Sequence, residues 1–148
     1  MKNKKAFTLI ELLVVIAVMA GLLALLVPNF MQVRIKARDV RRKSDLKAIQ
    51  KALEMYKLGQ STPIYPAAAG LVACAPLSDA NNTYMQVVPQ DPLARCPTVS
   101  NSYSYVPAGD LYSYKLSACL EDPNDPEKVT CPAGFTCSSG KCYQLTNP

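Results

Sequence analysis

The sequence contains no histidine and no tryptophan, and only six glycines and three phenylalanines among 148 residues. Without histidine it lacks the commonest general base, the commonest metal ligand and any serine–histidine or cysteine–histidine relay. It also has no glycine-rich phosphate loop, no nucleophile elbow and no pair of carboxylates spaced for acid–base work. These absences exclude most classes of enzyme, and we predict a protein without catalytic activity.

Charged and apolar residues divide the chain into four segments. Residues 1–6 carry a net charge of +3, and Glu11 is the single charged residue of segment 7–27. Residues 28–58 carry +6, whereas residues 59–148 carry −3 and hold eleven of the twelve prolines and all six cysteines. This order predicts a basic leader, an apolar segment, a basic helix and an acidic, cysteine-rich head.

Segment 7–27 is long enough to cross a membrane. A helix rises 1.5 Å per residue, so about 20 residues span a hydrocarbon core of roughly 30 Å. A cleavable secretory signal is the alternative, because lysines precede the segment and Val18–Ala20 is a passable small-residue cleavage site before Gly21. However, the apolar run continues to Val27, and a signal peptide has no use for Glu11. We therefore favour a single membrane span.

Glu11 is the residue that most needs an explanation. A charged side chain at the centre of a membrane helix costs about 2.5–3.5 kcal/mol on insertion scales. Either the carboxylate is tolerated close to the interface, or it has a cationic partner inside the bilayer.

Residues Ala6–Val18, with the sequence AFTLIELLVVIAV, follow a short lysine-rich leader. This segment resembles the class III signal of type IV prepilins and type II secretion pseudopilins. The resemblance implies cleavage between Ala6 and Phe7 by a prepilin peptidase on the cytoplasmic side, followed by N-methylation of Phe7. The family usually has glycine where Ala6 stands. Pro28 falls where many members carry a helix-disrupting proline, so we expect the helix to be interrupted there.

The resemblance also implies a function and partners. The chain is expected to be a structural subunit of a pilus-like or pseudopilus filament, polymerised through its N-terminal helix. The new ammonium group of Phe7 would pair with Glu11 of a neighbouring copy and fix the register of assembly. The expected partners are further copies, the membrane, the prepilin peptidase and the assembly machinery. Pilus, secretion pseudopilus and DNA-uptake system remain open.

The location of the head involves two opposing signals. The positive-inside rule places the highly basic residues 34–47 in the cytoplasm. The cysteines and the resemblance favour a single-pass cytoplasmic membrane protein with the head outside, and later an extracellular filament or periplasmic pseudopilus. The alternative function is a minor tip pilin whose head binds a ligand or DNA. The acidic head disfavours nucleic acid, which is bound through Lys and Arg.

Residues 28–58 predict an amphipathic helix that ends at Gly59. Basic side chains cluster between residues 34 and 43. We interpret them as a solvated face that contacts lipid headgroups and the acidic heads of neighbours, with nucleic acid or anionic lipid binding as the alternative. The predicted buried stripe consists of Phe30, Val33, Ala37 and Val40, followed by Leu46, Ile49, Leu53 and Tyr56.

The head, residues 59–148, predicts a small antiparallel sheet, and the whole chain an α+β fold of pilin type. Period-two alternation marks strands at 102–106 and 111–120 around the turn 107–110, and a third strand is expected around 142–145. The predicted register places Val106 opposite Leu111, Tyr105 opposite Tyr112 and Tyr103 opposite Tyr114.

The six cysteines predict three disulfides in an oxidising compartment. Zinc is the alternative, but there is no CxxC pair and no histidine. Sequence proximity favours a Cys74–Cys96 bridge, with the other four closing the C-terminal region. The cysteines are Cys74, Cys96, Cys119, Cys131, Cys137 and Cys142.

The acidic loop Glu121–Glu127 offers four carboxylates and an amide as oxygen ligands for calcium. Some pseudopilins hold calcium in a C-terminal loop, but the spacing matches no EF-hand. We favour a solvated acidic turn, and predict no metal or cofactor.

Overall fold

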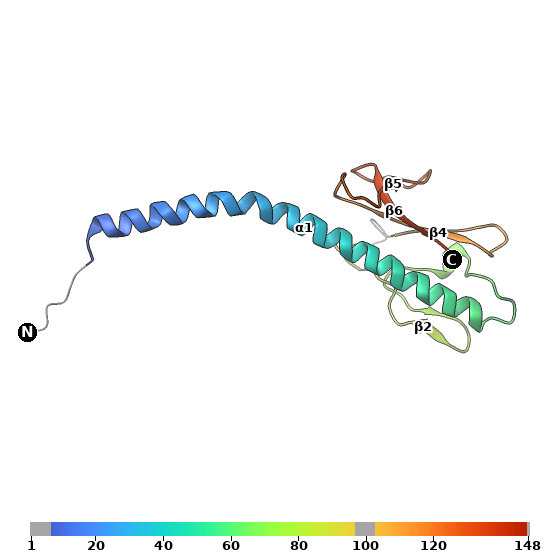
Figure 1. Ribbon diagram of the computed structural model, residues 1–148. Coiled ribbons are helices and arrows are strands. Elements are labelled where there is room, and N and C mark those ends of the chain that lie inside the picture. Colours follow the sequence, from blue (N-terminus) through green and yellow to red (C-terminus); the bar gives the residue numbers. More distant parts are fainter. Residues whose placement is uncertain (1–6, 97–102, 148) are drawn as a thin grey trace, which may run out of the picture. The chain divides into compact units, whose positions relative to one another are not determined.

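The computed structural model describes residues 7–96 and 103–147, without the side chains of residues 26–29 (Figure 1). The chain divides into two units, Met1–Ile35 and Lys36–Pro148. The predicted α+β class is confirmed, since a long helix precedes two small antiparallel sheets. The elements are α1 (Leu9–Gly59), the 3-10 helix η1 (Ala68–Gly70), β1 (Leu77–Ser78), β2 (Thr83–Met85), β3 (Ser104–Pro107), β4 (Tyr114–Cys119), β5 (Val129–Thr130) and β6 (Lys141–Thr146).

The first unit contains the beginning of α1 and little else. The helix is long and apolar enough to cross a membrane. The predicted interruption at Pro28 is wrong, because the helical assignment of α1 continues across it. A proline removes a single hydrogen bond of the helix ladder, and the bonds of the neighbouring turns remain. Leader residues 1–6, Ala6 included, lie outside the described residues.

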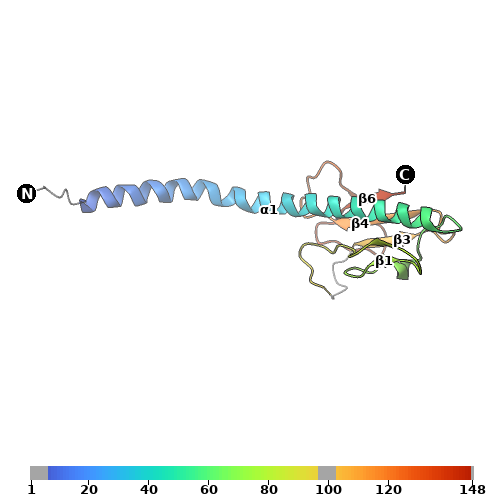
Figure 2. The ribbon, with the colours of Figure 1, turned by 90° about the horizontal axis from the view of Figure 1, so that it is seen from below.

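The second unit is built on a four-stranded antiparallel sheet in the order β3-β4-β6-β5. Figure 2 shows β3 and β4 lying along α1, and one face of this sheet packs on the helix. Leu46, Ile49 and Leu53 follow one another at helical spacing and are fully buried, as the sequence predicts. From the sheet, alternate residues of β4 complete the core, namely Tyr114, Leu116 and Ala118.

The predicted hairpin is present as β3 and β4, but its predicted register is wrong. Val106 lies opposite Lys115 rather than Leu111, and residues 108–113 connect the strands. Leu111 has a left-handed backbone conformation (φ 59°), and its carbonyl accepts a hydrogen bond from the Tyr65 N–H at 2.8 Å. Because this contact with a distant segment holds Leu111 outside the ladder, the connection is longer than the predicted turn.

The tyrosine pairs change with the register. Tyr105 lies opposite Leu116 instead of Tyr112, and it contacts Tyr114 diagonally with ring centroids 5.9 Å apart. Tyr114 also meets Tyr65 edge to face at 4.6 Å. Tyr105 and Tyr114 therefore act as strand-packing residues that, with Tyr65, belong to the core between sheet and helix.

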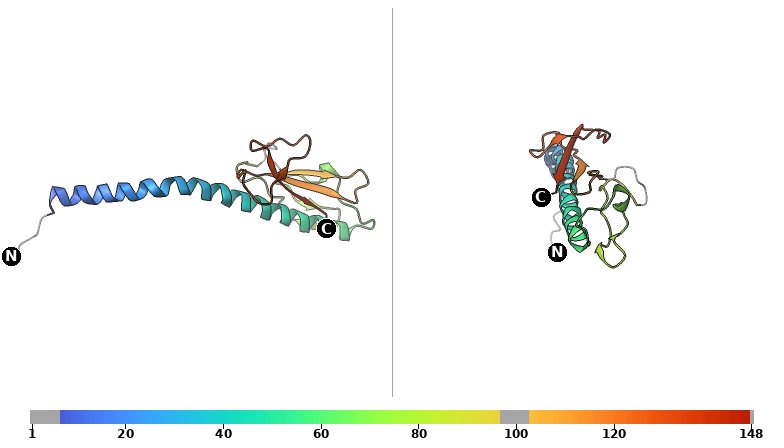
Figure 3. Two further views of the ribbon diagram at one scale, coloured as in Figure 1. Left: turned by 45° about the horizontal axis from the view of Figure 1, so that its top comes forward. Right: turned by 90° about the vertical axis from the view of Figure 1, so that its right-hand side faces the viewer.

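Three disulfides close the head, and the predicted Cys74–Cys96 bridge is one of them. The others join Cys119 to Cys137 and Cys131 to Cys142, so the last four cysteines pair among themselves, as predicted. Figure 3 shows the C-terminal strands that they flank, in orange to red, lying along α1. These paired sulfurs offer no thiolate ligand for zinc.

Candidate functional site

The start of α1 is a capping box formed by Thr8 and Glu11. The Glu11 carboxylate accepts hydrogen bonds from the Thr8 N–H at 2.9 Å and the Thr8 hydroxyl at 2.8 Å. The Glu11 N–H in turn donates to Thr8 Oγ1 at 3.3 Å. This is the reciprocal pattern of a Thr-x-x-Glu box, which satisfies backbone donors that the first turn leaves unpaired. Glu11 therefore has a partner within its own chain.

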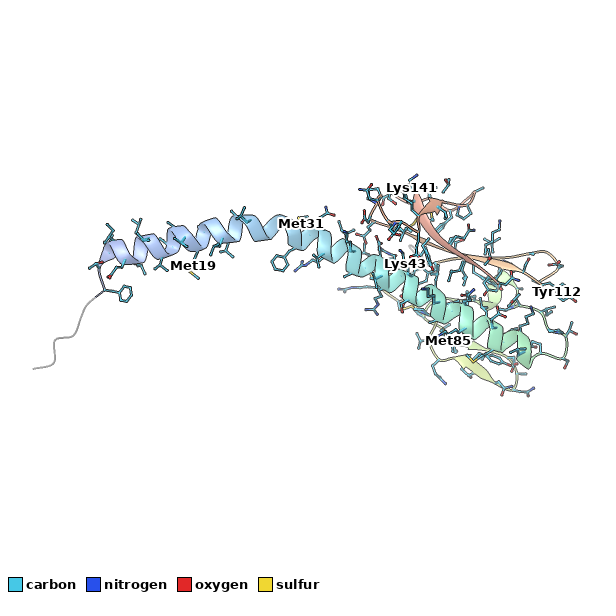
Figure 4. The ribbon with its side chains drawn as sticks, in the orientation of Figure 1. Met19, Met31, Lys43, Met85, Tyr112 and Lys141 are labelled. Carbon is cyan, nitrogen blue, oxygen red and sulfur yellow. A yellow bond between two sulfur atoms is a disulfide. The ribbon has the colours of Figure 1, made fainter. Side chains whose placement is uncertain are left out.

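The apolar surface that follows has no cover from this chain. Every residue from Phe7 to Leu25 is exposed, and the exposed fraction reaches 81% at Phe7 and 82% at Leu9. Met19 in Figure 4 is one of these uncovered side chains. Soluble monomers rarely expose continuous apolar surface of this extent, so a membrane or other subunits must cover it.

The face of α1 that packs against the head is charged at Asp39 and Arg42 and apolar from Leu46 onward. Asp39 and Arg42 are 1% and 2% exposed and lie in line with the buried Leu46. The predicted upper stripe is wrong, because Val33 and Val40 are 62% and 65% exposed. The head buries these charged side chains because it supplies opposite charges for them.

Arg42 is the centre of a buried network of ions. Its guanidinium forms a two-point contact with Asp91, at 2.6 Å through Nε and 3.1 Å through Nη2. Its Nη1 donates to Asp39 at 2.7 Å and lies 2.6 Å from a carboxylate oxygen of Glu121. Arg38 adds a second ion pair to Glu121. A planar guanidinium with five donors suits such a site, and an ammonium group does not.

Asp39 extends this network to the backbone of the loop after β4. Its carboxylate accepts the N–H groups of Glu121 at 3.0 Å and Asp122 at 2.8 Å. The hydrogen bond from Arg38, together with that from Arg42, lowers the pKa of Glu121 despite partial burial. The network joins α1, the Asp91 segment and the loop after β4.

Lys43, labelled in Figure 4, binds two further carboxylates of the acidic loop. Its ammonium group lies 2.7 and 2.8 Å from the two oxygens of Asp125 and 2.7 Å from Glu127. Burial alone would raise the pKa of Asp125, but the bonds from Lys43 and from the Glu127 N–H lower it. The interpretation of the basic face as solvated is therefore wrong for Arg38, Arg42 and Lys43, which bind the head of their own chain.

The candidate residues thus fall into two groups. Phe7 and Glu11 lie on the exposed apolar segment, and the cysteines lie in the head, where they form disulfides. The network of Asp39, Arg42 and Asp91 was not predicted. The i,i+3 spacing of Asp39 and Arg42 on the face that continues to Leu46 was a usable signal for it.

Comparisons with known proteins agree with this geometry. A family model described as the prokaryotic N-terminal methylation motif matches residues 1–27. The type II secretion system core protein G of Vibrio cholerae is 31% identical over 118 residues, covering 74% of this chain and 75% of the relative. That of Pseudomonas aeruginosa is 34% identical over 126 residues, covering 76% and 83%.

A pilus protein is also similar. The type IV wide pilus major component of Thermus thermophilus is 44% identical over 62 residues, covering 42% of this chain and 47% of the relative. No solved structure matches the chain significantly. The alignments with the two core proteins G are long enough to extend into the head, and the family model covers the N-terminal segment. The chain therefore belongs to the family of type II secretion pseudopilins and type IV pilins, as a structural subunit.

Proposed function

We propose that this chain is inserted into the membrane as a precursor, cleaved between Ala6 and Phe7, methylated on Phe7 and polymerised through α1 into a filament. The observation that carries the proposal is the uninterrupted exposure of Phe7 to Leu25, in a chain whose described residues include no buried side-chain nitrogen or oxygen without a hydrogen-bond partner. An apolar helix that its own chain leaves bare can leave lipid and pack against other copies. Relatives of both the secretion and the pilus type match, and the proposal covers both kinds of filament.

Glu11 sets the register in this proposal. In the membrane the capping box satisfies its carboxylate within the chain. In the filament the ammonium group of a neighbouring Phe7 replaces the lost solvation of that carboxylate, because two buried opposite charges offset each other's desolvation. In the membrane the Glu11 carboxylate is bonded only within its own chain. In the filament the Glu11 carboxylate and the Phe7 ammonium group of the neighbour are paired with each other.

The chemistry of the head supports the external position in this proposal. Three disulfides persist in an oxidising compartment and are rare in the cytoplasm. The basic residues after the span would oppose this orientation as free charges, but Arg38, Arg42 and Lys43 are paired with carboxylates of the head. The alternative of a minor tip pilin has no support from the comparisons, whose descriptions read core protein and major component.

The mature N-terminus tests this proposal. Intact mass spectrometry of assembled material is expected to show the chain from Phe7 onward with one added methyl group and three disulfides. A mature N-terminus at Gly21, or assembled chains that retain Met1, would overturn the proposal.

A further inference from the structure

One asparagine of this chain has the sequence context of a glycan acceptor. Asn81-Asn82-Thr83 matches the pattern Asn-x-Ser/Thr with no proline in the middle, which is the acceptor for N-linked oligosaccharides. None of the other six asparagines in the sequence has Ser or Thr two positions later. Such a pattern is short, so its structural context has to decide whether it can serve.

The pattern lies at the tip of the β1–β2 hairpin. Asn81, Asn82 and Thr83 are all exposed. The turn is closed by a hydrogen bond from the Asp79 N–H to the Asn82 carbonyl at 2.9 Å, and Asp79 Oδ1 accepts the N–H groups of Asn81 and Asn82, each at 2.7 Å. These bonds occupy the backbone and the Asp79 side chain, and leave the acceptor side chain on the surface.

The turn is also anchored to the rest of the head. Asp79 Oδ2 accepts hydrogen bonds from the Tyr84 hydroxyl at 2.6 Å and from the Gln60 side chain at 2.9 Å. Tyr84 in turn packs edge to face on Tyr56 of α1, with ring centroids 5.3 Å apart. The hairpin tip therefore presents its polar side chains outward from a fixed base, and a large group added there displaces nothing from the core.

We propose that Asn81 is an N-glycosylation site. Its Nδ2 forms a bond to the anomeric carbon of a lipid-linked oligosaccharide donor, while the bond from that carbon to the diphosphate oxygen breaks. The lipid diphosphate leaves with the electron pair, and Nδ2 gives one of its two protons to a base of the transferase. Thr83 supplies the hydroxyl that defines the acceptor pattern.

The compartment fits this chemistry. The donor is used on the side of the membrane where secreted domains form disulfides, and this inference therefore rests on the external head of the proposed function. The Cys74–Cys96 bridge closes the segment that contains the hairpin. Because an oligosaccharide is bulky and hydrated, it also places the β1–β2 tip on the outer surface of a filament, outside the contacts between subunits.

Mass spectrometry of the full-length protein from its native cells tests the site. Trypsin is expected to release residues 58–95 after Lys57 and Arg95, and this peptide contains Asn81 and Asn82 as its only asparagines. We expect a glycan mass on this peptide. It is lost completely in Asn81→Gln and Thr83→Val, and retained in Thr83→Ser and in the neighbouring control Asn82→Gln.

Two results overturn the inference. One is an unmodified peptide 58–95 from mature chains whose N-terminus is Phe7 and whose cysteines are all paired, which leaves the filament proposal intact. The other is a glycan that survives Asn81→Gln, which assigns it to another side chain. Free thiols together with a bare Asn81 would instead show that the head is in the cytoplasm, and both proposals then fail.

Discussion

The two units of this chain differ in how they accommodate their apolar and charged side chains. From Phe7 to Leu25 the chain exposes every apolar side chain and bonds its single carboxylate locally to Thr8. Among the described residues, including those of the head, no buried side-chain nitrogen or oxygen lacks a hydrogen-bond partner. The second unit, Lys36–Pro148, thus packs its own core and pairs its own buried polar groups, whereas the N-terminal segment is complete only in a membrane or an assembly.

The charges follow the same division. At the level of segments, a helix with a charge of +6 and a head with −3 suggest attraction between neighbouring subunits. Within one chain, however, Arg42 alone meets Asp39, Asp91 and Glu121. Four of the head's carboxylates, Asp91, Glu121, Asp125 and Glu127, are thus paired with α1 of their own chain, and the apolar surface of Phe7 to Leu25 is left uncovered.

The largest effect is expected at Glu11, whose substitution tests whether the N-terminal segment depends on assembly. Glu11→Val leaves the ammonium group of a neighbouring Phe7 buried alone, and loss of one member of a buried pair costs on the order of 3–5 kcal/mol at every contact. We expect normal membrane levels, normal cleavage after Ala6 and few or no filaments by electron microscopy. Filaments in wild-type numbers would remove the register role of Glu11.

Substitution of Arg42 tests whether the second unit depends on its buried network of ions. Arg42→Met leaves three carboxylates facing one another and is expected to lower the free energy of unfolding by about 3–5 kcal/mol. Arg41→Met is the matched control, because Arg41 is exposed on the same turn and should change stability by less than about 0.5 kcal/mol. Urea unfolding of the detergent-solubilised chain, with disulfides intact, measures both, and equal midpoints would contradict a structural role for the network.

Substitution of Gly59 tests the packing between the end of α1 and the head. An added Cβ there would overlap the Tyr84 hydroxyl oxygen, so Tyr84 must move and lose its bond to Asp79. We expect Gly59→Ala to destabilise the head by about 1–3 kcal/mol, as other overpacked sites do. Gly109→Ala is the control, since a Cβ there meets nothing within 4 Å. Thermal unfolding that does not separate the two variants would refute the contact.

Lowering the pH is expected to reduce the stability of the head gradually, and by less than the substitutions above. Hydrogen bonds from Arg38 lower the pKa of Glu121 below its ordinary value of 4.5, and Asp125 is also lowered from 3.8. A lowered pKa contributes stability that is present above the unfolded value and is lost as the pH falls through the folded value. We expect a constant melting temperature from pH 7 to about pH 5 and a fall below about pH 4.5. Glu121→Gln should melt lower at pH 7 and change less in acid.

Calcium is expected to have the smallest effect. Lys43 already binds both oxygens of Asp125 and one of Glu127, and a calcium ion in the acidic loop would have to displace it. We propose that the loop requires no metal, and that the melting temperature is the same in calcium and in a chelator. A rise of several degrees with calcium, absent in magnesium, would contradict this and restore the metal site.

Local patterns in the sequence were enough for the general architecture and the processing signal. Apolar length identified the candidate membrane span, the AFTLIELL motif identified the family, and the even number of cysteines predicted the disulfides. Helical spacing from Leu46 to Leu53 found the core face of α1. The Thr8–Glu11 capping box was equally readable from its spacing, because all of its atoms lie within one helical turn.

The tertiary structure alone decided what depends on distant segments. The hairpin register changed because Tyr65 binds the carbonyl of Leu111, and no pattern within the hairpin contains that contact. Apolar spacing predicted that Val40 would be buried, and the basic face that includes Arg42 was interpreted as solvated. The reverse holds because Asp91 and Glu121 arrive from remote loops. A sequence shows which charges a helix carries, but the cost of burying them depends on partners that only the folded chain brings within hydrogen-bond distance.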